Sequence, residues 1–281
     1  MKMKVFITAF IIPLQLILSC ILSVPEPATA GELNSLYDTT YKLHLGAFLP
    51  RMKTKTAVDP SNPLLPPGDL IDMENDFGLE KDLTLGRLDG YFRLGRRHRI
   101  QAGYFTLKRD GSRVINRNIT FGDITFPLNA TVESEAKNSI LEVGYMYSIV
   151  QNERFELSGT FGVHWLDVET RLTGDTGGGI VETESASAAG PLPLFGLDVD
   201  YALGARWILS FRAMRFAIEI DEYDGSLTDL RASIEYFFLE NFGVGLGVND
   251  FDLDVDFDGA RLAGELEWGY TGLQVFATLR F

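Results

Sequence analysis

The chain has 281 residues, of which 39 are acidic and 25 are basic, so its formal charge is −14 at pH 7. This acidic balance argues against nucleic acid as a partner, because phosphate backbones select basic surfaces. After residue 30 no stretch approaches the roughly 18 consecutive apolar residues of a membrane-spanning helix, whereas glycine and aromatic residues are plentiful.

The first 30 residues have the order of regions found in a secretory signal peptide. The start MKMK is followed by the apolar run VFITAFIIPLQLILSCILSV and by the small residues ATA before Gly31. This order predicts export and cleavage after Ala30. An uncleaved anchor helix is the alternative, because about 20 apolar residues can span a bilayer. The sequence thus predicts a signal peptide over 1–30 and one domain over 31–281.

Alternation of apolar and polar residues predicts about ten antiparallel strands along the rest of the chain. In chain order they cover 39–50, 83–95, 98–112, 131–149, 154–172, 191–202, 206–221, 227–239, 242–257 and 262–281. The connections near 95–99, 150–154, 203–206 and 239–242 are short, whereas 50–82 and 173–190 are long. Short turns at one end and long loops at the other are typical of membrane β-barrels. Eight or twelve strands also fit the pattern.

The last strand, TGLQVFATLRF, alternates apolar and polar residues and ends on Phe281. With the signal peptide and the alternation throughout, it makes the chain resemble the bacterial outer-membrane β-barrel proteins. The resemblance implies an all-β fold, a single antiparallel transmembrane barrel of the outer membrane with both termini in the periplasm. It also implies recognition of the last strand by the barrel-assembly machinery, contact with outer-membrane lipid and lipopolysaccharide, and no cofactor. It identifies no particular activity.

The periplasmic halves of the strands carry apolar residues on one face and polar residues on the other. In strand 154–172, Phe161, Val163 and Trp165 share a face opposite to His164. Lipid outside and a narrow polar lumen explain this arrangement. The expected lumen charges are Arg87, Asp89, Arg93, Glu142, Asp198, Asp200, Arg212, Arg231 and Glu235. They either fill a small barrel as a paired network or line a narrow pore.

The stretch FGVGLGVNDFDLDVDFDG, residues 242–259, changes phase near Asn249. Apolar residues take the even positions before it and the odd positions after it, where aspartates take the even ones. A β-bulge at Asn249 would restore a single face, but the same switch occurs in several other strands. We interpret the switch as the level at which the strands leave the lipid and continue into extracellular water, so that the apolar face turns inward.

The projecting halves are expected to enclose an apolar cup and to carry an acidic collar. The cup residues are Phe216, Ile218, Phe251, Leu253, Val255, Phe257, Leu266 and Trp268. The cup either binds a hydrophobic small molecule or is a closed core covered by loop residues such as Leu64, Leu65 and Phe77. No metal site is expected: Asp250, Asp252, Asp254 and Asp256 are about 7 Å apart along the strand, too far for a compact calcium site. They are weak candidates for divalent ions that bridge to lipopolysaccharide phosphates.

The three histidines, His44, His98 and His164, show no recognisable catalytic pairing. Outer-membrane lipid hydrolases resemble one another in pairing a histidine with a serine on an outward face. Ten-stranded surface proteases need acid and histidine pairs at the extracellular rim. Neither pattern occurs here, so we expect a non-enzymatic surface protein with a binding or structural role. The alternative is a narrow porin or a channel for small or hydrophobic solutes.

Overall fold

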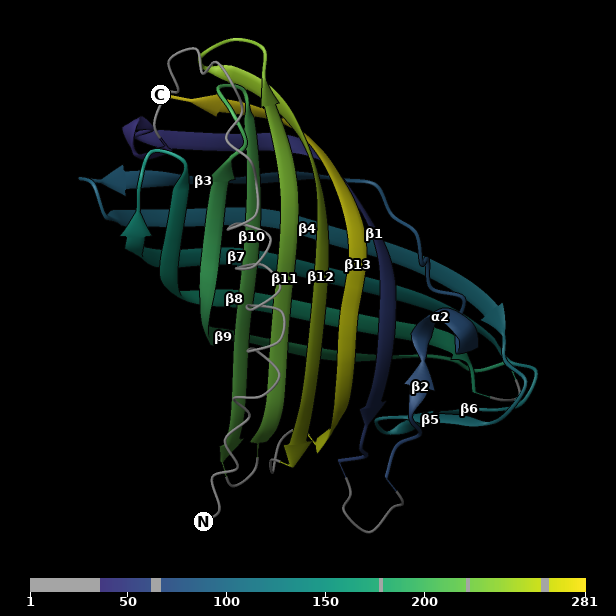
Figure 1. Cartoon of the computed structure of the whole chain (residues 1–281). Coiled ribbons are helices and arrows are strands. Elements are labelled where there is room, and N and C mark those ends of the chain that lie inside the picture. Colours follow the sequence, from purple (N-terminus) through teal and green to yellow (C-terminus); the bar gives the residue numbers. More distant parts are fainter. Residues whose placement is uncertain (1–35, 62–66, 177–178, 221–222, 259–262) are drawn as a thin grey trace.

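Figure 1 shows the computed structural model of the protein, which describes residues 36–61, 67–176, 179–220, 223–258 and 263–281. Ten long strands form one antiparallel sheet, and pairing of the last with the first closes it into a barrel. The strands are β1 (Tyr41–Val58), β3 (Leu85–Leu94), β4 (His98–Val114), β7 (Thr131–Gln151), β8 (Phe155–Asp175), β9 (Val181–Ala202), β10 (Trp207–Ile220), β11 (Tyr223–Phe237), β12 (Phe242–Asp258) and β13 (Ala263–Arg280). The predicted ten-stranded all-β barrel is confirmed. The predicted signal peptide, 1–30, lies outside the described residues.

The two ends of the barrel differ. β1 begins and β13 ends at the same end, which also carries the four short connections and is named the turn end below. The 3-10 turn η1 (Leu36–Asp38) lies there, with Leu36 buried inside the barrel. The opposite, loop end carries β2 (Ile71–Asp72), α2 (Met73–Asp76), β5 (Ile119–Phe121) and β6 (Ile124–Phe126), which gather beside β1 in Figure 1. No helix in the described part of the chain is long and apolar enough to cross a membrane.

Two strands extend well beyond their predicted bounds. β1 continues to Val58 and pairs with β13 as far as Gly264, and β9 begins at Val181 rather than near residue 191. The prediction of a long loop over 173–190 was therefore wrong for most of its length. These segments are rich in Thr, Lys, Ser, Ala and Glu and lack a repeating row of large apolar residues. Their strand structure depends on backbone pairing with β13 and β8, which side-chain alternation does not reveal.

β12 passes through Asn249 without a bulge. Its pairing with β11 and β13 is in constant register from Gly243 to Phe257. Val244 and Leu246 are exposed before Asn249, whereas Phe251 and Leu253 are buried after it. The apolar face therefore changes from the outside of the wall to the inside. The exposed apolar side chains of the turn-end half form a belt around the barrel, as in Leu45, Leu141, Phe161, Leu246 and Leu273.

This arrangement predicts opposite responses to substitution at two neighbouring positions. Leu253→Asp should lower the free energy of unfolding by about 3 kcal/mol or more, because it places an unpaired charge in a packed interior. Asp254→Asn should change it by less than about 0.5 kcal/mol, because this side chain lies on the exposed face. Denaturant titration of the refolded protein, followed by tryptophan fluorescence, measures both. The reverse ranking would contradict the register of β12.

Candidate functional site

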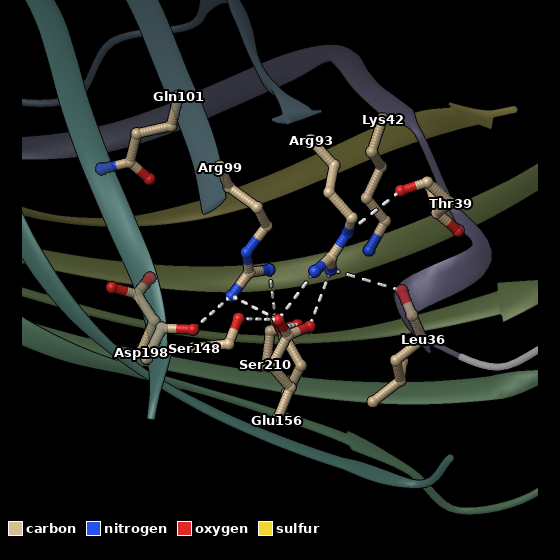
Figure 2. Close-up of polar contacts among 12 residues, drawn as sticks. Leu36, Thr39, Lys42, Arg93, Arg99, Gln101, Ser148, Glu156, Asp198 and Ser210 are labelled. Atoms are coloured by element: carbon tan, nitrogen blue, oxygen red, sulfur yellow. Dashed lines mark hydrogen bonds and ion pairs between the residues drawn. The ribbon is translucent and has the colours of Figure 1, made fainter. Parts of the chain in front are cut away.

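A buried ion pair lies in the lumen at the turn end, as Figure 2 shows. Arg93 on β3 donates from its two terminal nitrogens to the two carboxylate oxygens of Glu156 on β8, at 2.9 and 2.8 Å. It also donates to the backbone carbonyls of Thr39 at 3.3 Å and Leu36 at 3.4 Å. The pair therefore holds the N-terminal turn against the inside of the barrel.

A second arginine extends this group across the lumen. Arg99 on β4 donates to Asp200 at 2.9 Å and to Ser158 at 2.7 Å, and it lies 3.7 Å from Glu156. Asp200 also accepts a hydrogen bond from Ser210 at 2.7 Å. Glu156 and Asp200 each have a cationic and a hydroxyl partner, which a buried carboxylate requires if it is to remain charged.

The middle of the lumen holds two further carboxylate groups. The Glu235 carboxylate on β11 accepts hydrogen bonds from Lys42 at 2.6 Å and from Thr278 at 2.8 Å, and the ring of His44 lies 3.3 Å from it. On the β9 side, Arg212 donates to Asp198 at 2.5 Å. Arg212 also donates to Gln101, and Thr160 donates to Asp198. The bonds of Asp198 join neighbouring strands, whereas the bond from Arg212 to Gln101 connects β10 with β4, four strands away in the sheet.

The third group lies directly below the apolar interior of the loop-end half. Arg231 donates to Glu142 at 2.5 Å and to Asp229 at 2.6 Å. Arg87 donates to Asn249 at 2.8 Å and to Glu142 at 3.3 Å. Two cations and two carboxylates thus form a neutral cluster that is largely removed from solvent.

Glu142, His164 and Asp229 form a triad whose donor atoms lie within 4.8 Å of one another, which is close enough for a metal ion. Both carboxylates already contact an arginine, Arg87 or Arg231, and the two positive charges repel a further cation. The triad is also buried beneath the packed loop-end half. The donor set therefore does not fit a metal centre.

A cavity of about 110 Å³ lies among these groups, with room for several water molecules. Its charged lining consists of four cations and four carboxylates: Lys42, Arg99, Arg212, Arg231, Asp89, Glu142, Asp198 and Asp200. This balance favours neither an anion nor a cation. All nine predicted lumen charges lie inside the barrel, buried or half-buried.

The predicted apolar cup is a packed core in the structure. Phe251, Leu253 and Trp268 are at most 4% exposed, and Phe216, Val255 and Leu266 pack against them. The same core contains the buried residues Phe48, Met52, Phe105, Leu107, Ile140, Leu166, Leu194, Met214, Leu227 and Tyr270. Ile218 and Phe257 lie in β10 and β12, but their side chains, like Leu64 and Leu65, lie outside the described part of the structure.

The loop end is covered by the segment that contains α2. Glu74 on α2 accepts from Arg109 at 2.6 Å and from the backbone N–H of Thr54 at 2.9 Å, and all three residues are buried. Burial lowers the pKa of Arg109, although its bond to Glu74 opposes that shift. A second apolar cluster that includes Phe77 and Phe126 lies beside this ion pair.

Outside the core, the acidic collar faces solvent together with basic partners. Asp250, Asp252 and Asp256 on β12 are exposed. On the neighbouring β13, the hydrogen bond from Lys55 at 2.7 Å lowers the pKa of Glu267. Burial, with Asp256 nearby, raises the pKa of Glu265. The collar carboxylates thus have different partners and are not gathered around a common point.

Several lumen residues of this network are not among those predicted from the sequence. They are Lys42, Arg99, Glu156, Asp229 and Asn249. Asp229, Glu156 and Asn249 share the inward parity of Arg231, His164 and Phe251 on their own strands, so strict extension of the alternation would have found these three.

Two ion pairs of the chain provide a matched test of this network. Glu156→Ala leaves Arg93 and Arg99 buried without their shared carboxylate and should lower the free energy of unfolding by about 3–5 kcal/mol. Asp82→Ala breaks the exposed Arg51–Asp82 pair and should leave the free energy of unfolding nearly unchanged, because solvent screens this pair. Denaturant titration of both variants gives the comparison. Equal small losses would mean that the turn-end charges are hydrated rather than buried.

Comparisons with known proteins bear on the fold. No protein-family model matches the chain, and no curated protein matches it. Among solved structures, the outer membrane protease OmpT from Escherichia coli is 10% identical and covers 90% of this chain and 100% of its own, with a TM-score of 0.57. The toluene transporter TodX from Pseudomonas putida is 9% identical over 86% of this chain and 90% of its own, with a TM-score of 0.38. Ail from Yersinia pestis is 8% identical and covers 83% of this chain and 98% of its own, with a TM-score of 0.32.

At such identities the likeness concerns the fold alone. The barrel is closed, its strand number is ten, and its turn-end half has an apolar belt around a polar interior. Each of these features is that of a protein built for a bacterial outer membrane. The chain therefore has the fold of the outer-membrane β-barrel proteins, without assignment to a subfamily.

Proposed function

We propose that the protein is a closed, non-conducting barrel of the outer membrane whose loop end forms a binding or structural surface outside the cell. The observation that carries this proposal is the filled lumen. Paired charges occupy its turn-end half and an apolar core its loop-end half. A solute would have to displace several buried side chains at both levels to pass through.

The proposed orientation places the turn end in the periplasm. It is supported by the short connections and by the termini of the barrel at that end, an arrangement common to outer-membrane barrels. The ring of Phe281, which is half exposed, stacks on Tyr41 at 5.1 Å between centroids. We propose this terminal side chain as the contact for the barrel-assembly machinery. Lipopolysaccharide would surround the barrel at the level where the acidic collar borders the apolar belt.

The placement of the histidines supports a role without catalysis. The chain has three of them. His44 and His164 lie inside the barrel, and His98 lies at the turn end, where its ring contacts Tyr145. OmpT is a protease, but the loop end of this chain offers no histidine to activate a nucleophile there. We therefore do not extend that activity to this protein.

The alternative, a narrow porin or a channel for hydrophobic solutes, requires an opening through the layer that contains Phe48 and Phe105. These rings are at most 1% exposed and lie edge to face at 5.7 Å. The Arg87 guanidinium lies 4.9 Å from the centre of the Phe105 ring and connects this layer to the charges below. The apolar core and the charge network below it are thus in direct contact.

Conductance distinguishes the two functions. The refolded chain, residues 31–281, should give no steady current in a planar bilayer, because side chains of the described residues fill both halves of the lumen. Heat-modifiable migration on gels shows that the inserted sample is folded, and a known porin added afterwards shows that the bilayer reports channels. Steady single-channel steps from the folded protein would overturn the closed barrel and favour the porin.

A further inference from the structure

The wall of the barrel is split between β9 and β10 in the loop-end half. β9 pairs with β8 from Val181 to Tyr201, but it pairs with β10 only from Phe195 to Ala202. β10 continues to Ile220 beside β11 alone. In Figure 1, β10 descends steeply whereas β7 and β8 cross the view nearly level. Residues 181–194 of β9 thus have a strand on one side and, in the described part of the chain, none on the other.

The direction of the backbone groups on this edge follows from the ladder. In an antiparallel sheet, the N–H and C=O of alternate residues point to opposite neighbours. The N–H of Ala202 donates to the carbonyl of Arg154 on the β8 side, and the register with β8 is constant along β9. Even-numbered residues therefore point toward β8. Odd-numbered residues, including Ser185 and Ser187, present their backbone groups to the free edge.

Two prolines explain why the split begins where it does. Pro191 and Pro193 are odd-numbered and follow directly beyond the last pair, Phe195 with Arg215. Proline has no N–H to give to β10, so the ladder ends at this point. Beyond them, residues 181–190 contain no proline and no lysine, the residues that commonly protect a sheet edge from other chains.

We infer that this edge of β9, residues 181–189, is a docking strand for an extended segment of another polypeptide, which would add to the sheet beside it. The inference rests on the proposed function in that the loop end must face water outside the cell. The exposed residues of β8 opposite this edge include Asp167 and Arg171, which place it above the apolar belt. A lipid chain cannot supply the hydrogen bonds that the edge offers, whereas a peptide backbone can.

The surroundings of the edge indicate the chemistry of the partner. On the inner face, Ala186 and Ala188 line an apolar crevice of about 50 Å³ with Phe121 and Leu266. Side chains of an added strand beside Ala186 and Ala188 should therefore be apolar. Glu182 and Glu184 share this inner face nearer the tip of β9, whereas the outer face carries the neutral residues Thr183, Ser185 and Ser187, and the chain as a whole carries a charge of −14. The outward side chains of the partner should be neutral or basic.

A synthetic peptide tests the inference directly. The probe is a fluorescein-labelled ten-residue peptide in which valine alternates with threonine and lysine, titrated with the refolded protein in detergent micelles and followed by fluorescence anisotropy. We expect saturable binding. Ser187→Pro removes an N–H from the free edge and should weaken binding about tenfold or more, whereas Ser187→Ala should leave it unchanged. Methylation of alternate peptide nitrogens should abolish it. Heat-modifiable migration reports that each variant is folded.

Three results would overturn the inference. The first is the absence of saturable binding up to about 1 mM, which is already a weak limit for specific recognition. The second is equal binding of the peptide by Ser187→Pro. The third is a dimer that the protein forms without peptide and that Ser187→Pro dissociates. The last would make a second copy of this chain the occupant of the edge. Conductance separates this inference from the proposed function: a protein that conducts and still binds the probe through Ser187 would overturn the closed barrel alone.

Discussion

The structure depends on one constraint, the need of every strand in hydrocarbon for a backbone partner on both sides. Pairing of β13 with β1 meets it by removing both edges of the sheet, over seventeen residue pairs from Lys42 with Arg280 to Val58 with Gly264. Closure with ten strands leaves an interior little wider than its own side chains. The polar lumen must therefore be filled, and its charges must find partners within the wall.

The charge network and the apolar core are two solutions to the same filling problem, separated by the water boundary. In the turn-end half the apolar residues face outward and the inward positions are polar. The charges at these positions are neutralised by pairs such as Arg93 with Glu156. In the loop-end half the outside is hydrated, and the inward positions can be apolar, as Phe251 and Leu253 are. Asn249 lies between the two regimes and bonds to Arg87 below the core.

Sequence alternation predicted the part of the fold that side-chain chemistry determines. It located ten strands, their inward faces and the phase change of β12, because each depends on the contrast between apolar and polar residues. It failed over 181–190, where small polar residues form a strand through pairing with β8. It could not decide between an open and a filled lumen either, since Lys42 and Glu235 come from strands 193 residues apart in the chain. Such pairings across the barrel depend on closure, which no local pattern encodes.

The position of the split in the wall follows from the same constraint that closes the barrel. A free strand edge in lipid would leave N–H and C=O groups without partners, at several kilocalories per mole each. The ladder between β9 and β10 is therefore intact through the belt and ends at Phe195 and Arg215, where an exposed arginine on β10 marks the approach to water. Above that level water can hydrate an open edge, so closure is no longer required. Pro191 and Pro193 end the ladder there and leave the upper part of β9 accessible to another chain.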